Sequence, residues 1–203
     1  MVHKPSDEEE NYFTNQEIAN RKEEDFKKEL DKAREKDIEM VSEQLNITDK
    51  ELAAHLVDLG FGAATVAAFP LIPLVYVAWA DGDVSNSERA RISEIATARG
   101  LKPGSEAFVF LEDLLQRRPA DGFLEICVNA VRRIYELFPD SEASDAKQDL
   151  VSLCVGIANA SGGFLGVFGN KVSDSELATI REIVGDLGLD ANDQTQDLLK
   201  TLG

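Results

Sequence analysis

Oxygen-bearing side chains are concentrated in one short turn of this sequence. Asp81, Asp83 and Ser85 occupy alternate positions, and Glu88 follows three residues later. Several oxygen ligands at such spacing suit hard cations such as Ca²⁺ and Mg²⁺. The turn is not an EF-hand loop, because Asn86 stands at the sixth position, where that loop needs glycine. The pattern therefore predicts a divalent-cation site of another kind.

The same residues also fit a purely structural role. Ser85 and Glu88 have the spacing of a capping box, in which each side chain satisfies a backbone N–H at the start of a helix. The positive end of the helix dipole would also favour the acidic side chains nearby. We favour helix capping as the role of these residues, and the cation site stays open as the alternative.

The turn and the helix after it recur in the second half of the chain. Eight identical residues are found at a constant offset of 88, within repeats of about 71–101 and 151–189. This duplication gives Glu176 the position of Glu88 and adds it to the candidate cation ligands. The identical residues are Val84, Ser85, Glu88, Ile92, Glu94, Ile95, Gly100 and Leu101, which recur as Val172, Ser173, Glu176, Ile180, Glu182, Ile183, Gly188 and Leu189.

Residues 48–203 carry the pattern of an all-α domain. Apolar residues recur at helical period between glycine and proline stops, and residues 48–51 repeat the capping-box spacing with Thr48 as the expected cap. Residues 60–80 contain no charge and are numerous enough to cross a bilayer. Because Pro70 and Pro73 interrupt this segment, we expect a buried hairpin of two helices and no membrane span, and leave membrane association open. The prediction is a compact, two-repeat helical domain.

The N-terminal quarter of the chain has a different composition. Residues 1–15 are polar and acidic, and we expect them to form a flexible tail. Residues 16–47 contain neither proline nor glycine, and Glu23 and Lys27 stand at the i,i+4 spacing of a favourable helical pair. An extended, charged helical arm of about 45 Å is predicted here, at about 1.5 Å per residue.

A protein partner is expected to bind apolar residues of the tail, the arm and a glycine-rich insert at residues 163–170. The apolar stripe of the arm is thin, so it buries little against the body. The insert either folds back on the core or meets a partner. The candidate partner-binding residues are Tyr12, Phe13, Phe26, Leu30, Phe164 and Phe168.

Charge and residue usage exclude several classes of function. With 21 basic and 38 acidic residues the formal net charge is -17, which repels phosphate backbones, so nucleic-acid binding is not expected. Cys127 and Cys154 lie in apolar runs without CxxC spacing and are expected to be buried, reduced thiols. The histidines are His3 and His55, from which no nucleophile–base set can be assembled, so we predict no catalytic residue. The polar, acidic start predicts a cytoplasmic protein.

The sequence Ala-Trp-Ala-Asp-Gly-Asp-Val-Ser at residues 78–85, followed by Glu88 and by a second copy ending at Leu189, resembles the tellurite-resistance TerB family. The resemblance covers about residues 59–203, and a similar domain occurs in a membrane-anchored DnaJ-type co-chaperone. It implies a compact helical fold built from two related halves. Members of that family act with other tellurite-resistance and stress proteins rather than as known enzymes. The suspected metal ligands that the resemblance implies are Asp81, Asp83, Glu88 and Glu176.

Two functions from different classes follow from these patterns. We expect a non-enzymatic, TerB-like binding or stress-response module that recruits a protein partner through its N-terminal helix and takes up Ca²⁺ or Mg²⁺ at the Asp81 turn. The alternative starts from residues 8–13, which together with the charged helix after them are similar to the inhibitor protein of rotary ATP synthases. That resemblance implies an inhibitory or regulatory arm that acts on a rotary ATPase.

Overall fold

A computed structural model describes residues 7–120, 122–161 and 172–202, with the side chains of residues 7–15 and 161 outside that description. Every regular element in the described part of the chain is a helix, which confirms the predicted all-α fold. The element η1 is a 3₁₀-helix, and the others are α-helices. In chain order they are α1 (Asp7–Gln44), α2 (Lys50–Asp58), η1 (Val66–Leu71), α3 (Ile72–Ala78), α4 (Asn86–Ala98), α5 (Glu106–Gln116), α6 (Phe123–Tyr135), α7 (Asp140–Ser161), α8 (Asp174–Asp186) and α9 (Asp193–Lys200).

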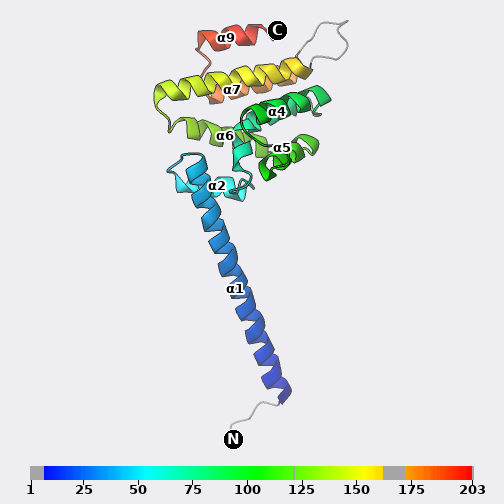
Figure 1. Cartoon of the computed structure of the whole chain (residues 1–203), viewed down its shortest axis with the longest axis vertical. Helices are drawn as coiled ribbons and strands as arrows, with labels where there is room; N and C mark the ends of the chain where they lie inside the picture. Colours follow the sequence, from blue (N-terminus) through cyan, green and yellow to red (C-terminus); the bar gives the residue numbers. More distant parts are fainter. Residues whose placement is uncertain (1–6, 121, 162–171, 203) are drawn as a thin grey trace.

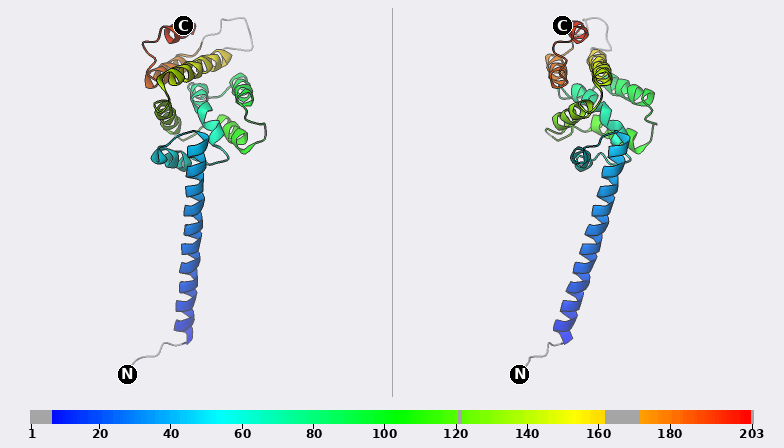
Figure 2. Two further views of the ribbon diagram at one scale, coloured as in Figure 1. Left: turned by 60° about the vertical axis from the view of Figure 1, so that its left-hand side comes forward. Right: turned by 90° about the vertical axis from the view of Figure 1, so that its left-hand side faces the viewer.

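The molecule consists of a body and a long arm (Figure 1). The arm is α1, which leaves the body as a single straight helix, while the other helices pack together around its C-terminal end. Two further views show the same separation, with α9 on the far side of the body from the arm (Figure 2). Within the body, α7 lies between α9 and α4 and contacts both.

The two repeats fold alike, as the duplication predicts. α4 and α8 both begin at a serine cap, and both end at a glycine in the left-handed region, with φ 93° at Gly100 and 69° at Gly188. Glycine adopts this conformation without steric cost. The leucine that follows, Leu101 or Leu189, donates its N–H to a carbonyl in the last turn at 3.0 Å, which is the Schellman motif. Because α4 contacts α7 and α8 contacts α3, the two halves close over a shared core.

Equivalent isoleucines of the two repeats lie at the centre of this core. Ile92 of α4 and Ile180 of α8 both have 0% exposure and belong to one continuous apolar cluster. Full burial of a large aliphatic side chain contributes about 1.5 to 3 kcal/mol relative to leaving it in water. The spacing of the repeat therefore predicts both the helices and the core residues through which they pack.

The uncharged segment is buried, but it is not the predicted hairpin of two helices. η1 runs directly into α3, and only α3 is an α-helix. Proline is the reason: Pro70 lies inside η1 and Pro73 lies in the first turn of α3, and neither residue has the backbone N–H that a longer α-helix requires. Within the described residues, no helix combines the length and the apolar character needed to cross a bilayer.

The end of the arm is fastened to the body by polar contacts. The guanidinium of Arg34 donates two hydrogen bonds to the carboxylate of Asp58, both at 2.9 Å. The carboxylate of Asp37 accepts from the N–H of Ala63 at 3.1 Å, and the amide of Gln44 donates to the carbonyl of the same alanine at 2.9 Å. These contacts hold the last turns of α1 against the body and leave residues 16–36 exposed.

Two helix starts differ from the sequence prediction. α1 begins at Asp7, so most of the expected flexible tail, residues 1–15, belongs to the helix. The acidic run that suggested a tail is favoured at a helix N-terminus by the helix dipole. α2 is capped by Asp49 rather than Thr48, because the Asp49 carboxylate accepts from the N–H groups of Glu51 and Leu52 and also pairs with Arg133.

Truncation of either equivalent isoleucine should destabilise the body. We expect Ile92→Ala and Ile180→Ala each to lower the free energy of unfolding by about 2 to 5 kcal/mol, because each leaves a cavity in a fully buried site. Urea denaturation followed by circular dichroism measures this change. Val109→Ala on α5 is the control, since Val109 is 52% exposed, and a loss of equal size there would contradict the shared core.

Candidate functional site

The two capping boxes are formed as predicted and have nearly the same geometry. The hydroxyl of Ser85 accepts from the N–H of Glu88 at 3.2 Å, and the Glu88 carboxylate accepts from the N–H of Ser85 at 2.8 Å. In the second box the equivalent distances between Ser173 and Glu176 are 3.1 and 2.8 Å. Each glutamate therefore satisfies the backbone at the start of its helix, α4 or α8.

Both of these glutamates are buried, and the negative charge of Glu176 acts on Glu88. Glu88 is 2% exposed and Glu176 is 1% exposed. Burial raises the pKa of Glu88, hydrogen bonds from Ser85 oppose that rise, and the negative charges of Glu176 and Asp81 add to it. The Oε1 atom of Glu176 is buried without a hydrogen-bond partner among the described residues. Each half thus buries one carboxylate, and a negative charge there is costly unless a proton or a cation compensates it.

The acidic turn itself faces solvent. Asp81 and Asp83 are exposed, and a carboxylate oxygen of Asp81 accepts from the N–H of Asp83 at 3.3 Å. Ser85 is half-buried, with its hydroxyl directed at the start of α4. Of the predicted ligands, Glu88 and Glu176 are buried, whereas the two aspartates face solvent. Throughout the described residues, no group of three or more His, Cys, Asp or Glu side chains is placed to hold a metal ion.

A comparison with protein-family models identifies the family of the body. Residues 65–197 match the family model described as tellurite resistance protein TerB. The chain belongs to the TerB family. No curated protein and no solved structure matches it. The TerB match covers the body from η1 into α9, and TerB proteins are not a known enzyme family. The match does not reach the arm. It therefore adds no support to the likeness between the arm and the ATP synthase inhibitor protein.

Outside the TerB match, the arm exposes large apolar side chains. The two candidates that can be placed, Phe26 and Leu30, are 62% and 54% exposed. Ile18, which the sequence analysis did not single out, is 47% exposed on the same helix. At about 100° per residue these three side chains lie within about 120° of arc, and we call them the arm stripe. Of the other candidates, Tyr12, Phe13, Phe164 and Phe168 lie outside the described side chains.

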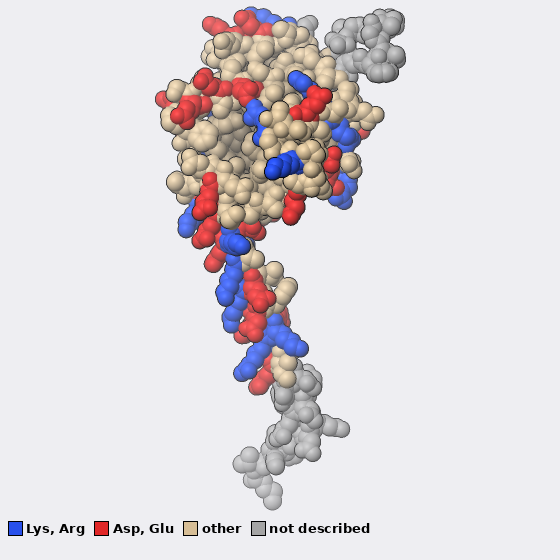
Figure 3. All heavy atoms as spheres, viewed as in Figure 1, with Lys and Arg blue, Asp and Glu red and all other residues tan. Residues whose placement is uncertain are grey.

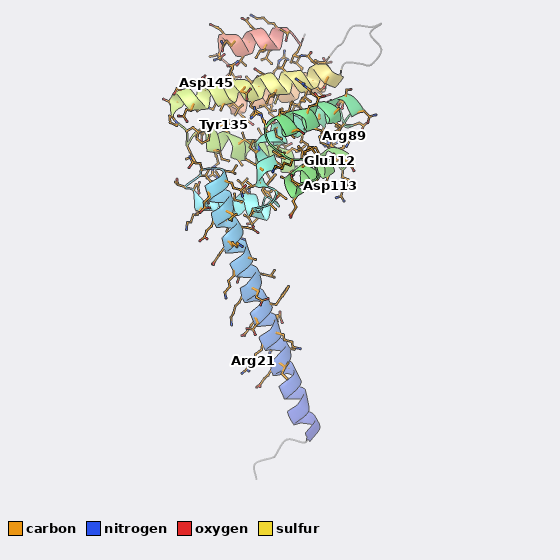
Figure 4. The ribbon with its side chains drawn as sticks, viewed as in Figure 1. Arg21, Arg89, Glu112, Asp113, Tyr135 and Asp145 are labelled. Atoms are coloured by element: carbon orange, nitrogen blue, oxygen red, sulfur yellow. The ribbon has the colours of Figure 1, made fainter. Side chains whose placement is uncertain are left out.

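The base of the arm borders an apolar cavity that the sequence did not reveal. Its volume is about 220 Å³, and its wall joins the end of α1 to η1, α6 and the residues just after α6. Tyr135, labelled in Figure 4, lines it, and burial raises the pKa of that phenol. Because three separate segments of the chain form the wall, local periodicity could not indicate it. The lining residues are Gln44, Leu45, Phe69, Pro70, Val131, Ile134, Tyr135 and Phe138.

The cysteines carry no reactive thiol. Cys127 and Cys154 are both free and buried, as predicted. Burial raises the pKa of each thiol to about 12, so both remain protonated at neutral pH. A protonated thiol in an apolar core packs as a small hydrophobic group rather than as a nucleophile.

Buried Glu88 should make stability depend on pH. Because its pKa is raised, Glu88 holds a proton more tightly in the folded protein than in the unfolded chain. The contribution of Glu88 to the free energy of unfolding is therefore complete below its ordinary pKa, and it is lost as pH rises through the raised pKa. We therefore expect Glu88→Gln, which keeps an acceptor for Ser85, to gain stability relative to the unmodified protein as pH increases from about 4 to about 8. Urea denaturation across that range measures the difference.

An exposed glutamate of the same helix provides the control. Glu94 lies on α4 with its side chain 68% exposed, so Glu94→Gln should change the pH profile little. If the difference between Glu88→Gln and the unmodified protein is the same at all pH values, the glutamate pair does not carry the charge cost described above.

Proposed function

We propose that this TerB-family chain is a non-enzymatic binding module in which the body supports the arm and the arm recruits a protein partner. The supporting observation is the arm stripe: Ile18, Phe26 and Leu30 are about half exposed or more, on a helix whose far end is fastened to the body. Large apolar side chains in water forgo about 25 cal/mol for each Å² that a partner could bury. A partner that buries the stripe would therefore gain from it.

The chemistry of the arm favours a protein over other partners. Phe26 and Leu30 stand four residues apart, which is the anchor spacing of a helix that lies in the groove of another protein. Charges of both signs alternate along the rest of the arm, as the space-filling view shows (Figure 3). The net charge of -17 opposes binding to nucleic acid or to anionic lipid. A helical or grooved protein surface matches these features.

A second function is favoured by the buried glutamates. We propose that a divalent cation binds beside Glu88 and Glu176, because Oε1 of Glu176 is buried without a partner among the described residues and the charge of Glu176 raises the pKa of buried Glu88. Magnesium is commonly held by one or two carboxylates together with water, so a third protein carboxylate is not required. The cation would compensate the charge that the two halves place in the core. A proton on the pair is the competing form of compensation.

Removal of the arm stripe should abolish partner recruitment. We expect Phe26→Ser with Leu30→Ser to weaken capture of the partner by about 30-fold or more, since buried aromatic anchors carry a large share of binding energy. Full-length protein is used as bait in native lysate, with quantification by mass spectrometry. Val109→Ser is the matched control, because it removes an equally exposed apolar side chain from the body. Equal capture by all three proteins would contradict the proposed role of the arm.

The cation proposal predicts measurable heat of binding. Calorimetric titration with Mg²⁺ and with Ca²⁺ should show binding to the unmodified protein, weakened about 10-fold or more in Glu176→Gln, which removes a ligand charge. Glu94→Gln, exposed on α4, should bind as the unmodified protein does. If neither ion gives heat with the unmodified protein, a proton rather than a cation compensates the glutamate pair.

A further inference from the structure

The apolar cavity at the base of the arm shares no residue with the capping boxes or with the arm stripe. We propose that this cavity binds a small, uncharged aromatic molecule of one or two fused rings. The cavity lies where the end of α1 meets η1 and α6, so a ligand there would touch both the arm and the body. This inference does not depend on the functions proposed for the arm stripe or for the buried glutamates.

The volume of the cavity limits the size of the ligand. At about 220 Å³ it is larger than an engineered protein cavity of roughly 150 Å³ that is lined by similar apolar side chains and takes up benzene. It is smaller than the pockets of about 300 Å³ or more that hold drug-sized molecules. A single aromatic ring therefore leaves space in the cavity, and two fused rings fill it.

The lining of the cavity favours an uncharged ligand. None of the described residues that line it is acidic or basic, and Tyr135 keeps its proton at neutral pH because burial raises its pKa. A charged ligand would lose its hydration there without a compensating group. The hollow between α2 and α6 is different, because it is lined by His55, Glu125 and Arg133. The charge of the lining thus separates the cavity at the arm from a polar site.

Half of the eight lining residues carry a ring, namely Phe69, Pro70, Tyr135 and Phe138. The ring of Phe69 meets the ring of Phe61 edge-on, with the two centroids 5.1 Å apart. The centroids of the Tyr135 and Phe138 rings lie 6.1 Å apart. An aromatic ligand would add edge or offset contacts to rings that other side chains already hold. Because the wall is formed in advance, little ordering cost opposes binding.

Gln44 provides a hydrogen-bond acceptor at the mouth of the cavity. Its side-chain amide donates to the carbonyl of Ala63 at 2.9 Å, and its Oε1 atom has no hydrogen-bond partner among the described residues. Gln44 is exposed, whereas Val131 and Ile134 on the α6 side are 3% and 6% exposed. A ligand with one ring N–H, such as indole, could therefore place its rings against α6 and its polar edge at the mouth.

A ligand in this cavity would hold the end of the arm in place. Gln44 ends α1 and Leu45 follows it, while the rest of the wall belongs to the body. A ligand that contacts both parts favours the state in which the end of α1 is packed against the body. The N–H of Leu45, which donates to the carbonyl of Val41 at 3.0 Å, should then exchange with solvent more slowly when the ligand is bound.

Calorimetric titration of the full-length protein with indole tests the proposal. We expect saturable binding with a dissociation constant below about 1 mM, which a molecule of this size can reach in a well-formed apolar site. Leu45→Trp and Val131→Phe should each weaken binding about 10-fold or more, because the added ring occupies the space of the ligand. Val109→Phe is the matched control, since it adds a ring at an exposed position of α5.

The filled variants allow a clear decision. Circular dichroism and urea denaturation show which of the two is folded, and one folded variant is sufficient for the test. Absence of indole binding to the unmodified protein, or unchanged binding to a folded filled variant, overturns the proposal. Hydrogen exchange at Leu45, followed by NMR, locates the site, and the same exchange rate with and without indole contradicts its position at the base of the arm.

Three further probes test the chemistry of the ligand. Indole-3-acetate is ionised at neutral pH and should bind about 10-fold or more weakly than indole, so equal binding would contradict an uncharged ligand. 1-Hexanol is uncharged but not aromatic, and binding equal to that of indole would contradict the aromatic class. N-acetyltryptophanamide carries the indole on a peptide-like group. If it binds more tightly than indole, the cavity accommodates a side chain of a partner protein, and the small-molecule proposal is wrong.

Discussion

Burial of a capped carboxylate at the start of each repeat is the constraint on which the rest of the body depends. Glu88 and Glu176 must each stay bonded to the backbone of their own helix while the two halves close around them. An unpaired polar group in such a place costs about 1 to 3 kcal/mol and a charge costs more, so the position of each helix start tolerates little change. The starts of α4 and α8 in turn set which faces carry Ile92 and Ile180 into the core.

The same constraint separates two roles that were difficult to tell apart in the acidic turn. Ser85 and Glu88 are engaged with each other, whereas Asp81 and Asp83 remain in water. The hydroxyl of Ser85 accepts from the helix N–H of Glu88 and also lies 3.3 Å from the hydroxyl of Ser87. Helix capping therefore accounts for the spacing of Ser85 and Glu88. Binding of a cation would depend on the carboxylate oxygens that the capping boxes do not use.

Local features of the fold could be predicted from the sequence, and features that depend on distant segments could not. The boxes, the glycine stops and the buried isoleucines follow from spacings of seven residues or fewer, repeated at one offset. The choice of Asp49 over Thr48 as the cap of α2 involves Arg133, which lies 84 positions away. The effect of the Glu176 charge on Glu88 and the cavity beside Tyr135 likewise arise only when separate elements pack. The start of α1 was mistaken because an acidic run is compatible with both a tail and a helix N-terminus.

The position of the fastening on α1 has a geometric consequence. The contacts with the body involve Arg34, Asp37 and Gln44, so the stripe residue Phe26 stands about 12 to 27 Å further along the helix axis, at about 1.5 Å per residue. A partner bound to the stripe would therefore lie at a fixed distance from the TerB body. A rigid helix maintains this distance better than a flexible linker would. The occupants proposed for the buried glutamates and for the arm would lie apart, so binding of one would leave the other site open.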